Sequence, residues 1–331
     1  MKATAKANSN IALIKYWGKR NSELILPMNS SISMTLSRLF TTTTVEFNDS
    51  LKQDEVNLNE KDLEFGAEKN SVIAFLNLIR KKAKINSFAR VASSNNFPTA
   101  AGLASSASGF AALALSASTA AELKLNEKDL SILARQGSGS ASRSVLGGFV
   151  EWLKGRKEDG SDSYAKQLFD ESHWPEFRML TTIVETEEKK VKSRAGMSQT
   201  MKTCALYNGW LDSVHEDLIS MKKGLKDKNF SLVGETAELN ALKMHATMIS
   251  TDPPIIYWNS STMNIIHAVH SWREEGMECF FTIDAGPNVK VMCLQKDEKE
   301  LTSRLKKIQG VKDLIACSPG KKAELIQEHL F

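Results

Sequence analysis

Apolar and β-branched residues alternate with polar ones over residues 2–14 and 31–47. This alternation is typical of strands that bury one face against a core. The stretch between them carries Gly18, Pro27 and several basic residues, which predicts a loop-rich connection. Short apolar runs predict further strands at residues 87–94, 150–155, 178–185, 279–286 and 289–295.

Other segments place apolar residues at helical spacing. A helix with an N-cap is expected after Asn126, ending near Gly137. Further helices are predicted at residues 69–84, 203–223, 229–248, 259–274, 297–308 and 319–330. Three segments are expected to lack regular structure: the Gly/Ser-rich 137–149, the polar 155–175 and the charged 187–203, which we interpret as a linker or binding loop.

Strands and helices are mixed without strict βαβ alternation, which favours an α+β fold in two halves. The 331 residues are enough for two domains. The change to a charged segment after residue 185 predicts domains at 1–184 and 185–331.

The stretch from Ser93 to Ala121 stands out because small and hydroxyl side chains lead into an alanine-rich helix. Backbone N–H groups at a helix start lack intrahelical partners, and small side chains let a phosphate approach them. An ordinary helix packed through Ala and Ser side chains explains the composition equally well.

The formal net charge of +4 is too weak and too scattered to indicate a nucleic-acid partner. The four cysteines, Cys204, Cys279, Cys293 and Cys317, show no CxxC pairing, so we expect free thiols in a reducing compartment. There is no signal-peptide core and no apolar run long enough to span a membrane. These features predict a cytoplasmic protein.

Three charged residues stand at unusual places for surface charge. Lys15 follows the apolar run IALI, Arg143 lies within the Gly/Ser-rich segment, and Asp284 ends the apolar strand FFTI. Each has an ordinary explanation as a turn, cap or surface residue. Together with a phosphate-binding loop they indicate phosphoryl chemistry, which needs cations and a carboxylate that orients the nucleophile. No GxSxG, dinucleotide-binding or Walker A pattern is present.

Several segments resemble the GHMP kinase superfamily and, within it, the diphosphomevalonate decarboxylase family. PTAAGLASSASGFAAL is similar to the superfamily's phosphate-binding motif. The decarboxylase motifs occur in the family's order as NSNIALIKYWGKRN, LPMNSSISMTL, GSGSASRSVLGGFVEW, SRAGM, HATMISTDPPIIYWN and TIDAGPNVKV. The resemblance implies the two-domain GHMP kinase fold. Its N-terminal half would be like ribosomal protein S5 domain 2, and its C-terminal half a ferredoxin-like α+β domain.

The resemblance also implies an activity: ATP- and Mg²⁺-dependent decarboxylation of mevalonate 5-diphosphate to isopentenyl diphosphate in isoprenoid biosynthesis, by a homodimeric enzyme. Asp284 would orient and deprotonate the 3-hydroxyl, Arg143 would hold the substrate carboxylate and orient Asp284, and Lys15 would complete the charged group. Substrate contacts are implied for Asn10, Tyr16, Lys19, Ser138, Ser140, Ser193 and Arg194. ATP phosphates would be held by Ser93, Ser94, Asn95, Gly102, Leu103, Ala104, Ser105 and Ser106. Mg²⁺ would be bound through those phosphates, with Ser106 as a candidate ligand.

Three alternatives stay open. Ala195 stands where some relatives carry a polar or acidic residue, which leaves a 5-monophosphate substrate open. A mevalonate 3-kinase shares the fold, although such kinases lack the full set of Lys15, Arg143 and Asp284. A non-catalytic ligand sensor is the third alternative. The basic residues Lys19 and Arg194 favour a diphosphate substrate.

Overall fold

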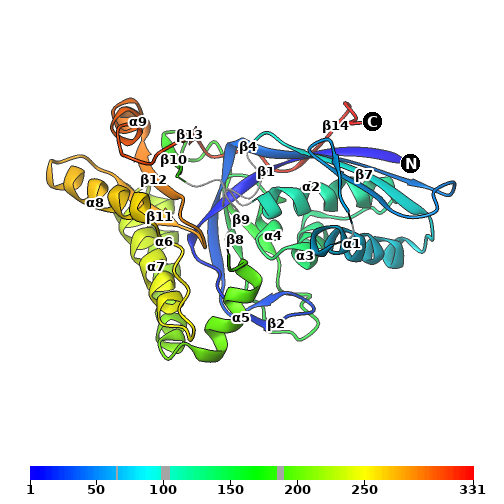
Figure 1. The fold of residues 1–331 in the computed structure, drawn as a ribbon, viewed down its shortest axis with the longest axis horizontal. Coiled ribbons are helices and arrows are strands. Elements are labelled where there is room, and N and C mark those ends of the chain that lie inside the picture. Colours follow the sequence, from blue (N-terminus) through cyan, green and yellow to red (C-terminus); the bar gives the residue numbers. More distant parts are fainter. Residues whose placement is uncertain (65, 98–104, 185–189) are drawn as a thin grey trace.

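The computed structural model describes residues 1–64, 66–97, 105–184 and 190–331 (Figure 1). The strands are β1 (Lys2–Ile14), β2 (Lys19–Asn21), β3 (Leu26–Pro27), β4 (Ser31–Asn48), β5 (Glu55–Leu58), β6 (Lys61–Asp62), β7 (Phe88–Asn95), β8 (Phe149–Trp152), β9 (Ala165–Phe169), β10 (Phe177–Ile183), β11 (Phe280–Ile283), β12 (Val289–Leu294), β13 (Asp313–Cys317) and β14 (Glu324–Ile326). The helices are α1 (Ala67–Ala83), α2 (Ser105–Ala120), α3 (Glu127–Gly137), α4 (Ala141–Ser144), α5 (Ser193–Thr203), α6 (Tyr207–Asp227), α7 (Phe230–Ile249), α8 (Ser260–Glu274) and α9 (Glu298–Lys306), with a single 3₁₀ turn at Gln295–Asp297.

The long strands β1 and β4 form the centre of the first sheet, whose order is β14-β1-β4-β7-β5-β6. They pair antiparallel from Lys2↔Glu46 to Ile14↔Ile32. β8 pairs with the first residues of β4 and with β9. Helices α1 to α4 lie on one side of this sheet (Figure 1).

Helix α2 packs directly against β1 and β4. Its alanines at 107, 111, 114 and 117 are buried, and their small side chains let the helix lie close to the strands. The ordinary packing explanation for the alanine-rich segment is therefore correct for the body of α2. It leaves the role of the helix start open.

The second sheet has the order β11-β12-β10-β13. Helices α6 and α7 pack on each other, and α7 also contacts β11 of this sheet and β1 of the first. One apolar cluster spans both sheets, with Ile11 and Leu13 from β1, Met179 from β10 and Val233 and Met244 from α7. The residues that meet at this junction are therefore held in a packed core.

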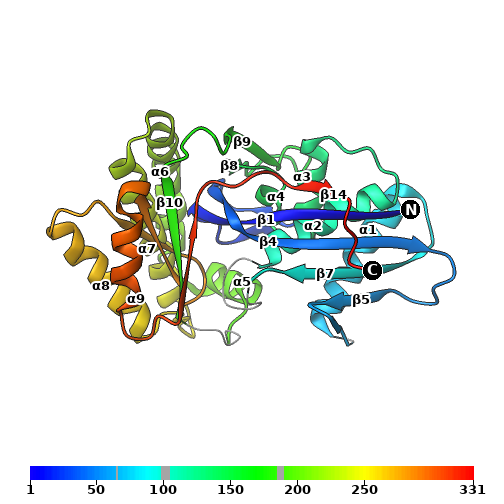
Figure 2. The ribbon, with the colours of Figure 1, turned by 90° about the horizontal axis from the view of Figure 1, so that it is seen from above.

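The chain does not stay in the second sheet to its end. After β13 it runs back along the first sheet, where β14 pairs with β1 (Figure 2). The helix predicted over residues 319–330 is wrong, because β14 gains its hydrogen bonds from a distant strand edge.

Most predicted elements are confirmed, and the remaining errors are local. The charged segment 187–203 is a helix from Ser193 onward, and the segments 137–149 and 155–175 contain α4 and β9. None of the described helices is long and apolar enough to cross a membrane. The four cysteines are buried and free.

Candidate active site

Lys15 and Asp284 form an ion pair where the two sheets meet. The Lys15 Nζ to Asp284 Oδ1 distance is 2.7 Å. Each residue lies one position beyond the end of a strand, Lys15 after β1 and Asp284 after β11. The Lys15 side chain is 1% exposed and that of Asp284 is 28% exposed, so the carboxylate faces a space that a ligand can enter.

Arg143 lies beside this pair, on the short helix α4, and is itself buried. Its Nη1 donates to Ser31 Oγ at 2.6 Å and its Nε donates to Asn10 Oδ1 at 3.2 Å. Asn10 in turn donates to Ser144 Oγ and to the Ser140 carbonyl oxygen. The guanidinium is therefore oriented by neutral groups, and its positive charge remains available to an anion.

The charges around Asp284 set its protonation state. Burial alone would raise its pKa, but the positive charges of Lys15, Lys290 and Arg143 and the hydrogen bond from Lys15 lower that pKa to about 2. Asp284 is thus a carboxylate at any physiological pH. It can accept a hydrogen bond from a hydroxyl group without first losing a proton.

A cavity of about 610 Å³ extends from these three residues. This volume lies within the range of small-molecule sites. All seven residues expected to contact substrate line the cavity: Asn10, Tyr16, Lys19, Ser138, Ser140, Ser193 and Arg194.

Tyr16, Ser138 and Ser140 lie on one wall. Tyr16 packs edge-to-face on Trp152, with ring centroids 4.7 Å apart, and its buried hydroxyl has no hydrogen-bond partner in the described part of the chain. Gly139 must be glycine, because a Cβ there would come within 3.0 Å of both rings. The Oγ atoms of Ser138 and Ser140, on either side of Gly139, are 3.4 Å apart. Both serines line the same cavity as Tyr16.

Further cationic side chains line the cavity, among them Lys19 and Arg194. Burial and the nearby Arg194 lower the pKa of Lys19 to about 8. Arg194 is exposed and donates from Nη2 to the Gly137 carbonyl oxygen at 2.7 Å. Ser193 and Arg194 form the first turn of α5, where backbone N–H groups favour anions.

The residues expected to bind ATP phosphates are only partly brought together. Ser93, Asn95, Ser105 and Ser106 line the cavity. Ser94 does not: it pairs with Thr42, and strand alternation places its side chain on the opposite face of β7 from its two neighbours. Gly102, Leu103 and Ala104 lie outside the described residues.

Sequence reasoning missed the apolar end of the cavity. This end lies between β5 and β7 on one side and α1 and α2 on the other. It is lined by Val56, Leu58, Leu63, Val72, Val91, Phe110 and Leu113. These residues come from β5, α1, β7 and α2 and from the loop after β6, and each shows an ordinary core pattern, so no local signal marks them as a site. Ser31, which orients Arg143, was missed for the same reason.

The described residues contain no group of three or more His, Cys, Asp or Glu side chains able to hold a metal ion. The Oγ atoms of Ser106 and Ser138 lie 3.3 Å apart in the cavity. Hydroxyl oxygens suit Mg²⁺, which in nucleotide sites takes most of its ligands from phosphates and water. The donor set therefore fits a magnesium ion carried in by a nucleotide.

Two α+β units, a helix start rich in small residues beside the cavity and a lysine–arginine–aspartate group in the cavity wall define an enzyme of the GHMP kinase type. Comparisons with known proteins specify the family further. Residues 7–165 match the diphosphomevalonate decarboxylase-like N-terminal domain, and residues 179–328 match the mevalonate 5-diphosphate decarboxylase C-terminal domain. The chain belongs to the diphosphomevalonate decarboxylase family.

Two relatives are similar in sequence to this protein over more than nine tenths of its chain. Diphosphomevalonate decarboxylase mvd1 of Aspergillus fumigatus is 39% identical over 93% of this chain and 81% of its own length. The human diphosphomevalonate decarboxylase is 38% identical over 91% of this chain and 78% of its own length.

Solved structures are similar as well. The mevalonate diphosphate decarboxylase of Staphylococcus aureus superposes with a TM-score of 0.93 at 42% identity, with 98% of each chain covered. A structure of MDDEF in complex with MVAPP, AMPPCP and magnesium also gives a TM-score of 0.93 at 42% identity, with 99% of each chain covered. The expected family and the expected two-domain α+β fold are thereby confirmed.

Proposed function

We propose that this protein converts mevalonate 5-diphosphate and ATP into isopentenyl diphosphate, ADP, phosphate and CO2, and that Lys15, Arg143 and Asp284 carry the reaction. Membership of the decarboxylase family supports the activity. The observation that carries the residue roles is the ion pair between buried Lys15 and partly exposed Asp284, beside Arg143 in the wall of a cavity that continues past Ser105 and Ser106.

Asp284 accepts a hydrogen bond from the substrate's 3-hydroxyl and orients its oxygen toward the γ-phosphoryl group of ATP. A carboxylate with a pKa near 2 is a weak base, so its main contribution is orientation. It takes up the hydroxyl proton as the oxygen gains its bond to phosphorus, and the β–γ bridging oxygen leaves with ADP. The tertiary hydroxyl, a poor leaving group, has then become a phosphate ester.

Phosphate then leaves from C3 with the electrons of the C–O bond. The electrons of the bond to the carboxylate move to form the double bond, and CO2 departs. Arg143 holds the substrate carboxylate until this point, and Lys15 balances negative charge near the transferred phosphoryl group. Asn10 lines the cavity, and its main role is to orient Arg143 by accepting a hydrogen bond from Arg143 Nε.

The substrate diphosphate binds where Lys19 and Arg194 supply charge and where Tyr16, Ser138, Ser140 and Ser193 supply hydroxyl groups. ATP lies in the part of the cavity that leads to its apolar end. The phosphates lie near Ser93, Asn95, Ser105 and Ser106, and the adenine lies in the apolar end. The hydroxyl of Ser106, which lines the cavity, would be a candidate ligand for Mg²⁺ bound with ATP, and the ion would neutralise phosphate charge there.

We also propose that the chain is a cytoplasmic homodimer with domains at 1–184 and 185–331, except that β10 belongs to the second sheet and β14 returns to the first. Four buried free thiols fit a reducing compartment. Sedimentation equilibrium of the purified chain tests the dimer. Limited proteolysis, read by mass spectrometry, tests the boundary, with cleavage expected near residue 185.

The decisive test compares turnover of mevalonate, its 5-phosphate and its 5-diphosphate, with CO2 and ADP measured in the same reaction. Equal release of the two from the 5-diphosphate is expected. ADP without CO2 would leave a 3-kinase, and a preference for the 5-phosphate would point to a monophosphate decarboxylase. Absence of both products would favour a ligand sensor.

A further inference from the structure

Helix α7 carries three buried polar side chains that bond the main chain near the candidate active site. Glu238 accepts from the Phe281 N–H at 3.1 Å, Asn240 accepts from the Lys15 N–H at 2.8 Å, and His245 bonds the Asp284 carbonyl oxygen at 3.2 Å. All three residues are less than a tenth exposed. A buried polar side chain without a hydrogen-bond partner is costly in free energy. Each of these three side chains therefore needs its main-chain partner.

Asn240 holds Lys15 at a point where the sheet no longer does. The pairing of β1 with β4 ends at Ile14↔Ile32, one residue before Lys15. The Asn240 amide takes over as acceptor for the Lys15 N–H. On the other side of the same residue, Asn29 Nδ2 donates to the Lys15 carbonyl oxygen at 2.8 Å.

The orientation of the Asn240 amide is itself fixed. Its Nδ2 donates to Asp217 Oδ2 at 2.7 Å, and that oxygen also accepts from Lys243 Nζ at 2.6 Å. A flipped amide would put an oxygen against a carboxylate. The Asn240 oxygen is therefore the amide atom that faces the Lys15 N–H. Through Asp217, helix α6 also contributes to the position of Lys15.

His245 does for Asp284 what Asn240 does for Lys15. Burial, together with the nearby positive charge of Lys15, lowers the pKa of His245 to about 3, so its ring is neutral. A carbonyl oxygen only accepts, so Nε2 carries the proton and donates it to the Asp284 oxygen. The ring lies against Trp258, with centroids 4.9 Å apart, which restricts its rotation.

We propose that Asn240 and His245 are positioning residues, which from a single helix fix the main chain at both members of the Lys15–Asp284 ion pair. The proposal deepens the function proposed above and rests on the roles given there to Lys15 and Asp284. Misplacing a reacting group by about 1 Å can cost about 100-fold in rate, so two hydrogen bonds at this place matter to turnover.

The test replaces each residue with leucine, which cannot form the hydrogen bond. Asn240→Leu and His245→Leu should each lower kcat by about 10- to 100-fold. The KM values for ATP and for mevalonate 5-diphosphate should stay within about threefold, because neither residue is among those that line the cavity. His245→Gln keeps an N–H donor near the position of Nε2 and should recover most of the lost kcat.

Val233→Ala is the matched control. Val233 is fully buried on α7, contacts the apolar core and bonds neither Lys15 nor Asp284. The Val233→Ala substitution should lower Tm because it weakens the packing of α7, and the kcat of this variant should remain near that of the wild type. An equal fall in kcat in this control would overturn the proposal, as would unchanged kcat in both leucine variants.

A crystal structure of each leucine variant separates this proposal from the proposed function. The distance between Lys15 Nζ and Asp284 Oδ1 should exceed the 2.7 Å of the parent chain. An unchanged distance contradicts the positioning role. Where the wild-type chain releases no CO2, the proposed function fails, and this distance still decides the role of α7. Where Asn240→Leu does not fold, the His245→Leu and His245→Gln pair decides it.

Discussion

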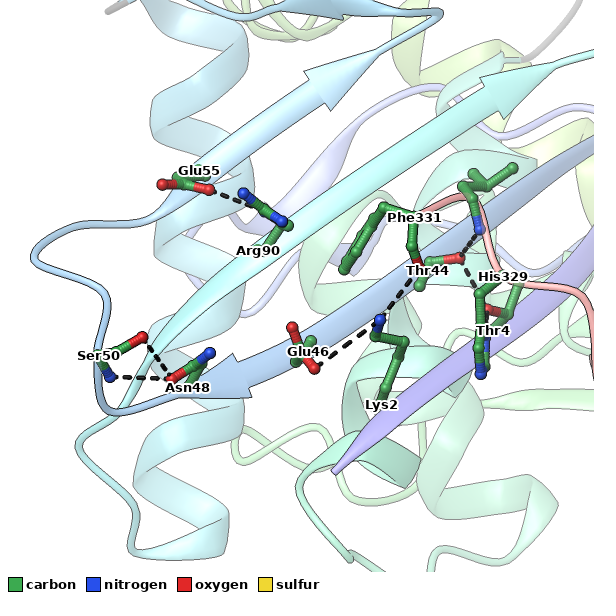
Figure 3. Close-up of polar contacts among 11 residues, drawn as sticks. Lys2, Thr4, Thr44, Glu46, Asn48, Ser50, Glu55, Arg90, His329 and Phe331 are labelled. Atoms are coloured by element: carbon green, nitrogen blue, oxygen red, sulfur yellow. Dashed lines mark hydrogen bonds and ion pairs between the residues drawn. The ribbon is translucent and has the colours of Figure 1, made fainter.

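Strand β1 has very different surroundings at its two ends. At its C-terminal end it leads into Lys15, whose ammonium is buried against Asp284. At its N-terminal end Lys2 forms a 3.9 Å ion pair with Glu46 and donates to the Phe331 carbonyl oxygen (Figure 3). Thr4, two residues further along β1, contacts His329 through its Oγ1, which lies 2.6 Å from His329 Nδ1.

Both ends tie distant parts of the chain to the first sheet, but with different energetics. At the outer end Lys2 and Glu46 are only partly buried and His329 is exposed, so water can replace the contacts that these side chains lose. At the inner end Lys15 and Arg143 are buried, so the charge of each depends on a particular partner. We therefore expect large effects of substitution at the inner end, intermediate effects at the cavity's exposed cations and small effects at the outer end.

Replacing Asp284 should give the largest effect. Asp284→Asn keeps the shape but removes the negative charge that orients the hydroxyl and accepts its proton, so kcat should fall about 1,000-fold or more. Binding of both ligands, measured by calorimetry, should persist. Turnover near the wild-type level would remove Asp284 from the mechanism and, with it, the chemical difference between the two ends.

The same substitution should also reduce stability. Asp284→Asn leaves the Lys15 ammonium buried without its counter-ion, next to Arg143 and Lys290, which should cost about 3 kcal/mol in the free energy of unfolding. Lys15→Met in the same chain removes that charge, so the double variant should be more stable than Asp284→Asn alone. Urea unfolding of the four chains gives the coupling. Additive losses would show that the inner pair behaves like an exposed one.

Arg194 should show an intermediate effect, confined to binding. It is exposed, and its replacement removes the hydrogen bond to the Gly137 carbonyl oxygen. Arg194→Ala should raise the KM for the diphosphate substrate about tenfold, the equivalent of about 1.4 kcal/mol, with a smaller change in kcat. An unchanged KM would place the diphosphate elsewhere in the cavity.

Lys19 should make binding depend on pH. With its pKa lowered to about 8, it is charged below pH 8 and neutral above it, so kcat/KM should fall as pH rises through about 8. Arg194 is one cause of the lowered pKa. In Arg194→Ala the midpoint should therefore move up, toward the usual lysine value. A midpoint that stays in place would assign the pH dependence to another group.

The sequence predicted the inner end better than the outer one. Lys15, Arg143 and Asp284 each stand beside an apolar or Gly/Ser-rich run, which marks them as unusual even before the family motifs are considered. The outer end gave no such signal, because the pairing of Glu324–Ile326 with β1 depends on residues more than 300 positions away. Ser94 was misjudged because neighbouring strand residues with the same chemistry face opposite sides, and the sequence does not fix which side is inward.

The smallest effect is expected at the outer end. His329→Ala removes the contact with Thr4 but leaves Leu330, whose N–H donates to Thr44 Oγ1 at 3.0 Å, and Phe331, whose ring lies 4.7 Å from Lys2 Nζ. Thr4 also keeps its 2.7 Å contact with Thr44. Because those contacts remain and His329 is exposed, the free energy of unfolding should fall by no more than about 1 kcal/mol. Both kcat and KM should match the wild type, since no residue of the outer end lines the cavity. A change in kcat would mean that β1 transmits strain along its whole length, and the two ends would then have to be treated as a single unit.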